Sequence, residues 1–326
     1  MEFFKTGTQI RFMGIRRYTG AISVLLWIVS IVLLSTKGIH LGLEFTGGTQ
    51  VEARFTEVMA PAIVRAALEK QGFHGIRVQQ QGSINDILIR VAPQKQEKTH
   101  GDASILSGSD IAERAMEQKQ IHVLKTVLET LDPSVDIRRT EFVGSEVGDQ
   151  LMEQGGIAIL VSILATMIYI TLRFEYRLAL SAAIGLCYDA FLILGIFSLF
   201  GFEFDLATLA SVLAVLSYSL NDTIVVFDRV RENFRKVRKG TPVEIMDLSI
   251  NQTLSRTIMT SWMTLLVVLA LLFFGGETLF GFSMAFFVGI VIGTFSSIYV
   301  SGALALWLGL SRADLMPKQR VDSGVP

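Results

Sequence analysis

Long stretches without charge constrain this chain more than any other feature of its sequence. Each runs for about the length of a membrane-crossing helix, and only two are interrupted, each by a single acid, Asp189 and Asp222. The stretches are residues 18–36, 154–172, 178–202, 206–227, 257–276 and 280–310. Because a bilayer core about 30 Å thick is crossed by roughly 20 apolar residues in a helix, the sequence predicts six transmembrane helices.

The composition agrees with a membrane protein and excludes several other classes. Charged residues make up 18% of the chain, whereas soluble domains average about 25% charged. The chain has 29 basic and 30 acidic side chains. A balanced charge does not favour a nucleic-acid binder, and the one cysteine, Cys187, has no partner for a disulfide. Phosphate-binding and zinc-binding motifs are missing, and no predicted span holds a histidine that could activate a serine. We therefore expect no enzymatic activity, metal or cofactor, and an ion gradient or a partner as the energy source.

The orientation follows from where Lys and Arg lie. The first span, preceded by four basic residues and followed by no small-residue cleavage site, reads as a retained signal anchor. If the N-terminus is inside, the inner segments carry 16 basic residues and the two short outer turns carry none. These inner segments are residues 1–17, 173–177, 228–256 and 311–326. The positive-inside rule thus predicts that both termini are cytoplasmic.

One large insertion, residues 37–153, separates the first two spans and is predicted to lie outside. Its pattern predicts, in order, a strand, a helix, two strands, a helix and a strand. The ranges are 51–55, 62–70 after Pro61, 76–78, 87–91, 111–131 and 135–143. This order is typical of a ferredoxin-like α/β domain, with residues 94–109 expected as a flexible loop.

Asp222 is the most informative residue inside a predicted span. Steps of three or four residues back along the helix reach a mostly polar stripe, which we expect to face the bundle interior: Tyr218, Val215, Ser211 and Thr208. An ionised acid at this depth costs at least ~2.5 kcal/mol, and such residues commonly mark ion or proton paths. The alternative is a structural ion pair or a hydrogen bond that holds helices together.

Two further polar residues leave alternatives open. Arg256 precedes the fifth span and could pair with Asp222 if the fourth and fifth helices are neighbours, or could simply extend to the membrane surface. Asp189 could carry ions or only join helices. In the sixth span, Gly289 and Gly293 form a GxxxG pattern that favours close helix packing.

Five segments, in order, carry a resemblance to a known family. They are LGLEFTGGT at 41–49, RFEYRLA at 173–179, YSLNDTIVVFDRVRENFRK at 218–236, LSRTIMTS at 254–261 and GTFSSIYVSGALAL at 293–306. They resemble the SecF subunits of bacterial SecDF protein-export complexes, over nearly the whole chain. Glu44 stands where this family more often has Asp.

The resemblance implies six helices like half of an RND-type transporter, in the bacterial inner membrane. It implies SecD, the SecYEG channel and an unfolded polypeptide as partners, YajC as an optional one, and proton flow coupled to late export. It assigns proton transfer to Asp222 and Arg256. Accessory candidates are Asp189, Asn221 and Thr260, and the family motif comprises Glu44, Phe45, Gly47 and Gly48. The alternatives are an RND-like exporter of small molecules or lipids and a passive assembly scaffold.

Overall fold

The computed structural model describes residues 10–73, 75–80, 83–92, 109–237 and 239–311. Two compact units divide the chain: Met1–His40 together with Ile157–Pro326, and Leu41–Gly156. The loop expected at residues 94–109 lies, apart from Ser109, outside the described residues, as do most of the expected terminal segments 1–17 and 311–326.

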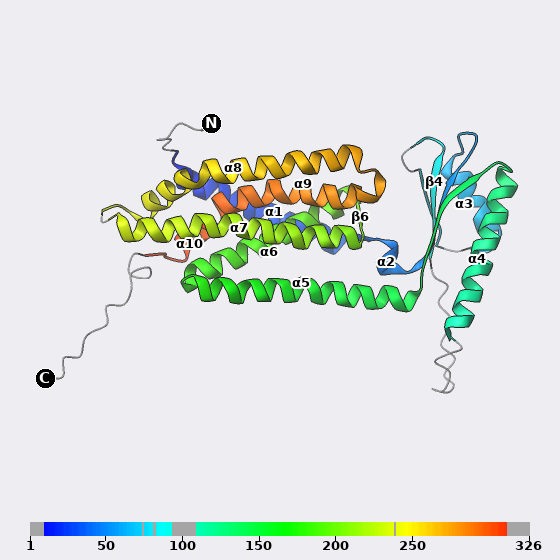
Figure 1. Ribbon diagram of the computed structural model, residues 1–326, viewed down its shortest axis with the longest axis horizontal. Coiled ribbons are helices and arrows are strands. Elements are labelled where there is room, and N and C mark those ends of the chain that lie inside the picture. The colour runs from blue at the N-terminus through cyan, green and yellow to red at the C-terminus, as the bar shows by residue number, and fades with distance from the viewer. Residues whose placement is uncertain (1–9, 74, 81–82, 93–108, 238, 312–326) are drawn as a thin grey trace. The chain divides into compact units, whose positions relative to one another are not determined.

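Helices make up the first unit (Figure 1). They are η1 (Phe12–Ile15), α1 (Arg16–Thr36), α5 (Ser145–Arg173, which begins in the second unit), α6 (Tyr176–Phe200), α7 (Leu206–Lys236), α8 (Pro242–Phe274), η2 (Glu277–Leu279), α9 (Phe280–Phe295), the π-helical turn η3 (Ser296–Val300) and α10 (Ser301–Trp307). Within the described residues, six helical segments are long and apolar enough to cross a membrane, the last being α9 to α10. The predicted fold class, a six-helix membrane protein with an inserted α/β domain, is confirmed.

Several helices run further than the uncharged stretches. α7 continues through the basic segment to Lys236, and α8 begins at Pro242, so most of the expected loop 228–256 is helical. A capping box starts α8, in which the Thr241 side chain accepts from the Glu244 backbone and the Glu244 side chain accepts from the Thr241 backbone. Charge therefore marks where an apolar span ends, whereas the caps mark where the helix ends.

Small residues bring the helices of the first unit close together. A Cβ atom on Gly195 of α6 would lie 2.4 Å from Ser30 Oγ of α1, and one on Gly289 of α9 would lie 2.3 Å from a Val215 methyl of α7. Gly293 packs against Ser219 in the same way. The predicted role of the GxxxG pattern in helix packing is confirmed, because helices in lipid associate by close backbone approach.

The second unit contains a four-stranded sheet with two helices. Its elements are β2 (Gly48–Arg54), α3 (Pro61–Lys70), β3 (Arg77–Gln80), β4 (Asp86–Val91), α4 (Ser109–Leu131) and β5 (Asp136–Val143), after a short helix α2 (Leu43–Thr46). The strand order is β3-β4-β2-β5, and all neighbours are antiparallel. The elements follow one another along the chain in the order that the sequence predicts, and this strand order is that of a ferredoxin-like sheet. Two-residue strands, β1 (His40–Leu41) and β6 (Glu203–Phe204), complete the elements.

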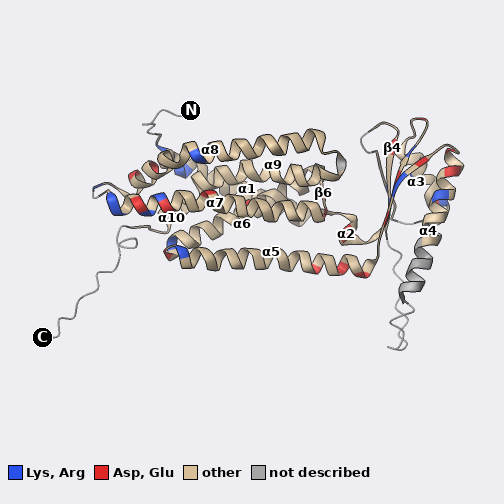
Figure 2. Ribbon diagram, viewed as in Figure 1, with Lys and Arg blue, Asp and Glu red and all other residues tan. Residues whose placement is uncertain are grey.

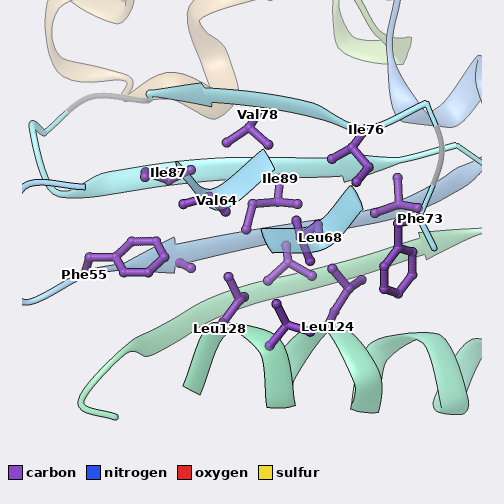
Figure 3. Close-up of a cluster of buried hydrophobic side chains, with 14 residues drawn as sticks. Phe55, Val64, Leu68, Phe73, Ile76, Val78, Ile87, Ile89, Leu124 and Leu128 are labelled. Carbon is purple, nitrogen blue, oxygen red and sulfur yellow. The ribbon is translucent and has the colours of Figure 1, made fainter. Parts of the chain in front are cut away.

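Alternation along the strands places one face of this sheet in a hydrophobic core (Figure 3). Val51 and Ala53 of β2 point to the same side as Ile87 and Ile89 of β4, and all four are buried. Leu124 and Leu128 of α4 pack against them with α3 residues Val64 and Leu68. Fourteen buried residues form this cluster, enough to expect that the unit folds independently.

The opposite face of the sheet carries an ion pair, from which we predict that the stability of this unit falls at acid pH. Arg54 Nε and Nη2 donate to Asp86 Oδ1 and Oδ2 at 2.5 and 2.6 Å, and this hydrogen-bonded guanidinium holds the pKa of Asp86 below its ordinary value. A carboxyl with a lower pKa in the folded state stabilises the fold above its unfolded pKa of about 3.9, and the benefit is lost as the pH falls through the folded pKa.

We expect a fragment of residues 41–156 to unfold cooperatively and Asp86→Asn to lower its melting temperature at pH 7. The difference from wild type should shrink as the pH falls below about 4, where wild type loses the same charge. Asp136→Asn is the control, because Asp136 is 72% exposed and pairs with Arg138 only at 4.0 Å. A pH-independent difference in melting temperature would contradict the assigned role of the ion pair.

Candidate functional site

The polar stripe of α7 faces the interior of the bundle, as predicted. Asp205 caps the helix, since its side chain accepts from the Thr208 backbone N–H at 2.6 Å. Thr208, Ser211 and Val215 are fully buried, and α7 packs against α8 and α9. Ser211 Oγ donates to the Phe282 carbonyl of α9 at 2.8 Å. The stripe is therefore a contact surface between helices, and its polar groups are screened from lipid.

Asp222 continues this stripe further along α7 towards its C-terminus and is only 4% exposed. Its Oδ2 atom has no hydrogen-bond partner among the described residues. Buried polar groups normally find a partner or hold an ordered water molecule. An acid in this position can change its protonation state without breaking an existing protein contact.

Arg256 of α8 lies near Asp222 but does not form an ion pair with it. Its charge acts on the Asp222 carboxyl, yet the ion pairs within 4.0 Å that join described residues do not include these two, and its side chain is exposed. The packing of α8 on α7 satisfies the condition for the predicted pairing. The contact itself is absent in this conformation of the described chain.

The two accessory candidates beside this pair form no hydrogen bond with the Asp222 side chain in the described structure. Thr260 Oγ1 donates to the carbonyls of Arg256 and Thr257, both at 3.0 Å, so it stabilises its own helix. Asn221 is exposed although the next residue, Asp222, is buried, because neighbouring residues on a helix point about 100° apart. Neither residue is part of the buried site in the described structure.

Asp189 of α6 is fully buried and is hydrogen-bonded to a residue of α7. Its Oδ2 atom accepts a hydrogen bond from Ser219 Oγ at 2.5 Å, while its Oδ1 atom has no partner in the described part of the chain. Ser219 stands three residues before Asp222, on the same buried side of α7. Sequence reasoning missed Ser219, although its spacing of one turn from Asp222 could have indicated it.

A π-helical turn interrupts the sixth span beside this carboxyl. It comprises Ser296–Val300, in which Ser296 and Ser297 are buried, and the Ser296 hydroxyl donates to the Gly293 carbonyl of its own span at 3.4 Å. Single π turns inside α-helices occur frequently at functional sites. This turn was not predicted from the sequence.

The family motif forms a separate structure in the second unit. Leu43–Thr46 make the single-turn helix α2, Phe45 is buried, and the two glycines that follow have φ angles of 66° and 120°. A Cβ atom on Gly148, near the start of α5, would lie 2.9 Å from the Gly47 backbone nitrogen. The two glycines thus permit a turn and a close backbone approach that other residues would prevent.

Glu44, the one departure from the usual family motif, lies in the first turn of α2. Among the described residues, no group of three or more His, Cys, Asp or Glu side chains could hold a metal ion. The buried site brings together the Asp222 and Asp189 carboxyl groups and the Ser219 hydroxyl, with Arg256 nearby.

Comparisons with known proteins match both parts of the chain. Residues 123–311 match the family described as "Protein export membrane protein SecD/SecF, C-terminal", and residues 32–57 match the "SecD/SecF GG Motif". The protein translocase subunit SecF of Vibrio alginolyticus is 43% identical over 323 residues, which is 99% of this chain and 97% of the relative. The chain belongs to the SecF family. The SecF of Pseudomonas aeruginosa is 42% identical, over 98% of this chain and 97% of the relative.

Solved structures of the larger SecDF protein have the same fold. The crystal structure of SecDF from Thermus thermophilus, a translocon-associated membrane protein, matches with a TM-score of 0.79 and 33% identity over 94% of this chain. The chain spans 39% of that protein. A structure of SecDF in the super-membrane-facing form matches with a TM-score of 0.65 and the same identity. The SecF matches contain Asp189, Asp222 and Arg256 in one segment and the glycine turn in the other.

Proposed function

We propose that this SecF-family chain couples proton movement across the bacterial inner membrane to a late step of polypeptide export. It would act with SecD and the SecYEG channel, with YajC as an optional further partner, on unfolded polypeptide. The observation that carries the proposal is Asp222, an acid buried at membrane depth with Arg256 nearby and with an oxygen that has no hydrogen-bond partner among the described residues. Such residues mark proton relays in pumps and transporters.

The geometry supports a cycle in which Arg256 controls the protonation of Asp222. Burial favours the neutral form of a carboxyl group, and a close guanidinium favours the charged form. In the described conformation the two side chains do not pair, so this is the state in which Asp222 takes up a proton. Movement of Arg256 towards Asp222 would then release it. One proton moving through 100 mV provides about 2.3 kcal/mol, enough to bias two packings of the helices.

A stripe of small and polar side chains on α7 supports SecD as the partner in the membrane. Ala210, Ala214, Ser217 and Asn221 recur at steps of three or four residues, and all are exposed in the single chain. By contrast, α5 exposes large apolar residues such as Leu160 and Ile168. Small and polar residues favour contact between helices, whereas large apolar ones suit lipid.

The proposed orientation has both termini in the cytoplasm and residues 37–153 in the periplasm. Figure 2 shows Lys and Arg gathered at one end of the helical unit and the middle lengths of its helices nearly free of charge. By the positive-inside rule this end is cytoplasmic.

We expect an impermeant maleimide applied from outside to label Val58→Cys but not Lys239→Cys, in a chain with Cys187→Ser. Both positions are exposed, Val58 by 68%, so access to the reagent depends on the side of the membrane. Labelling after the membrane is opened is the control for reactivity at residue 239. Labelling of residue 239 in sealed cells, with residue 58 protected, would reverse the proposed topology.

The measurement that tests the function is export into membrane vesicles with and without a proton gradient. A passive scaffold would support the same export when Asp222 loses its charge, because asparagine retains hydrogen bonding. A small-molecule or lipid exporter would leave gradient-stimulated polypeptide export unchanged when the chain is removed. Recovery of SecD and SecYEG with this chain from native membranes would support the proposed partners.

A further inference from the structure

Asp189 is a second buried acid at membrane depth, and its surroundings suit a group that gains and loses a proton. One of its carboxylate oxygens accepts from Ser219 at 2.5 Å, and the other has no partner in the described part of the chain. A carboxyl group used only to join two helices would be expected to have both oxygens satisfied when it is fully buried. The free oxygen leaves room for a proton.

Ser219 connects this acid to the site of Asp222. The two α7 residues are three positions apart, which is about 4.5 Å along a helix axis. Both are buried, at 2% and 4% exposure, and Ser219 donates to Asp189 across the contact between α6 and α7. A hydroxyl group can accept a proton on one side as it donates on the other. Ser219 donates to Asp189 in the described conformation and stands one helical turn from Asp222, so it is the hydroxyl group of α7 that could exchange protons with both.

We propose that Asp189 is a second proton-binding residue, which exchanges protons with Asp222 through the Ser219 hydroxyl. The inference rests on the proposed proton-coupled function. In the transfer, the O–H bond of protonated Asp189 breaks and its proton moves to the Ser219 oxygen, while the Ser219 proton forms a new O–H bond on Asp222. Asp189 is left as the carboxylate, Asp222 is neutral, and Ser219 is unchanged.

The charges around Asp189 agree with this role. On its own helix and on the elements packed against it, the titratable groups of the middle lengths are Cys187 and Tyr188 on α6, Asp222 and Tyr218 on α7, and Tyr299 in the π turn. The other charged side chains lie towards the helix ends: Arg16 and Arg17 on α1 and Lys37 at its C-cap, Arg177 on α6, Asp205 at the N-cap of α7, and Asp228, Arg229, Arg231, Glu232, Arg235 and Lys236 on α7. The Asp189 carboxylate therefore accepts a hydrogen bond from the neutral Ser219 hydroxyl and forms no ion pair within 4.0 Å among the described residues.

The test compares Asp189→Asn with wild type in the full complex at matched protein levels. Asparagine keeps the size and can still accept from Ser219, so a merely structural contact survives. We expect gradient-stimulated export to fall to the level seen without a gradient. We also expect pH-difference infrared spectra of the purified complex to lose the signal of one titrating carboxyl group. Retention of both the stimulation and the signal would overturn the proposal.

Two variants separate this inference from the proposed function. If Asp222→Asn is inactive and Asp189→Asn behaves as wild type, the inference fails and the proposed function stands. If Asp222→Asn keeps full stimulation, the proposed function fails, and the infrared signal still reports whether Asp189 binds a proton. Loss of that signal in Asp189→Asn supports the proton site independently of export.

Ser219→Ala tests the hydroxyl with a readout that a structural role would not change. Because the proposed transfer passes through this hydroxyl, its removal should lower gradient-stimulated export as Asp189→Asn does. Because a hydrogen bond to the charged form favours that form, the removal should also move the pH profile of the Asp189 infrared signal to higher pH. The control is Ser211→Ala, which removes another buried hydroxyl of the same helix face, bonded to the Phe282 carbonyl. It should leave the pH profile in place. An equal shift in both variants, or a shift in neither, would overturn the role of Ser219.

Discussion

Replacement of Asp222 by asparagine is expected to abolish the part of polypeptide export that depends on the proton gradient. Asparagine occupies nearly the same space and can hydrogen-bond, but it cannot take up or release a proton at this site. Because Oδ2 of the buried carboxyl has no hydrogen-bond partner within the part of the chain that the structure describes, the substitution breaks no observed hydrogen bond. The complex and its ATP-driven translocation should therefore persist at normal levels, as measured by co-purification and by export without a gradient.

Arg256→Met should fail in the same way for the complementary reason. Without the guanidinium, nothing favours the charged form of the buried acid, so Asp222 keeps its proton throughout the cycle. The double variant should be no worse than either single one, because residues that act as a unit are not additive. Asp228→Asn is the matched control, since this acid of the same helix is partly exposed and pairs with Arg173 at 2.7 Å.

The comparison is made in inverted membrane vesicles at matched protein levels. Asp228→Asn should keep most of the stimulation, because an exposed ion pair contributes little. Near-normal stimulation in Asp222→Asn, with the complex intact, would exclude the proton-carrier role and favour a passive scaffold.

The second large effect is expected at Gly289. An added Cβ would lie 2.3, 2.8 and 3.0 Å from three side-chain atoms of Val215, so Gly289→Ala must push α9 away from α7. Overpacking of this kind costs typically about 1–3 kcal/mol, and here it acts on the helix pair that holds the buried site. We expect less folded chain in the membrane and a lower melting temperature in detergent.

Two variants make this prediction specific. Val215→Ala removes the two methyl groups that an alanine at 289 would strike, so the double variant Val215→Ala, Gly289→Ala should recover stability relative to Gly289→Ala. Gly20→Ala in α1 is the control, because nothing lies within 4 Å of its added Cβ. Equal stability of wild type and Gly289→Ala would show that the two helices can separate without cost.

Much of the architecture could be predicted from the sequence because it depends on local pattern. The thickness of a bilayer sets the length of an uncharged helix, so the spans follow from where the charges lie. The inward face of α7 could be predicted because Thr208, Ser211 and Asp222 recur at helical spacing. In the inserted domain, alternation at Val51 and Ala53 marks a strand, and Pro61, the first residue of α3, marks a helix start.

What only the tertiary structure decided is which residues of different helices meet. The hydrogen bond from Ser219 to Asp189 joins positions 30 residues apart, and no spacing within one helix reveals it. The rotation of each helix in the bundle decides such contacts, and it depends on packing, such as Gly289 against Val215. The same packing leaves Arg256 unpaired with Asp222 in this state, although their separate positions in sequence allowed an ion pair.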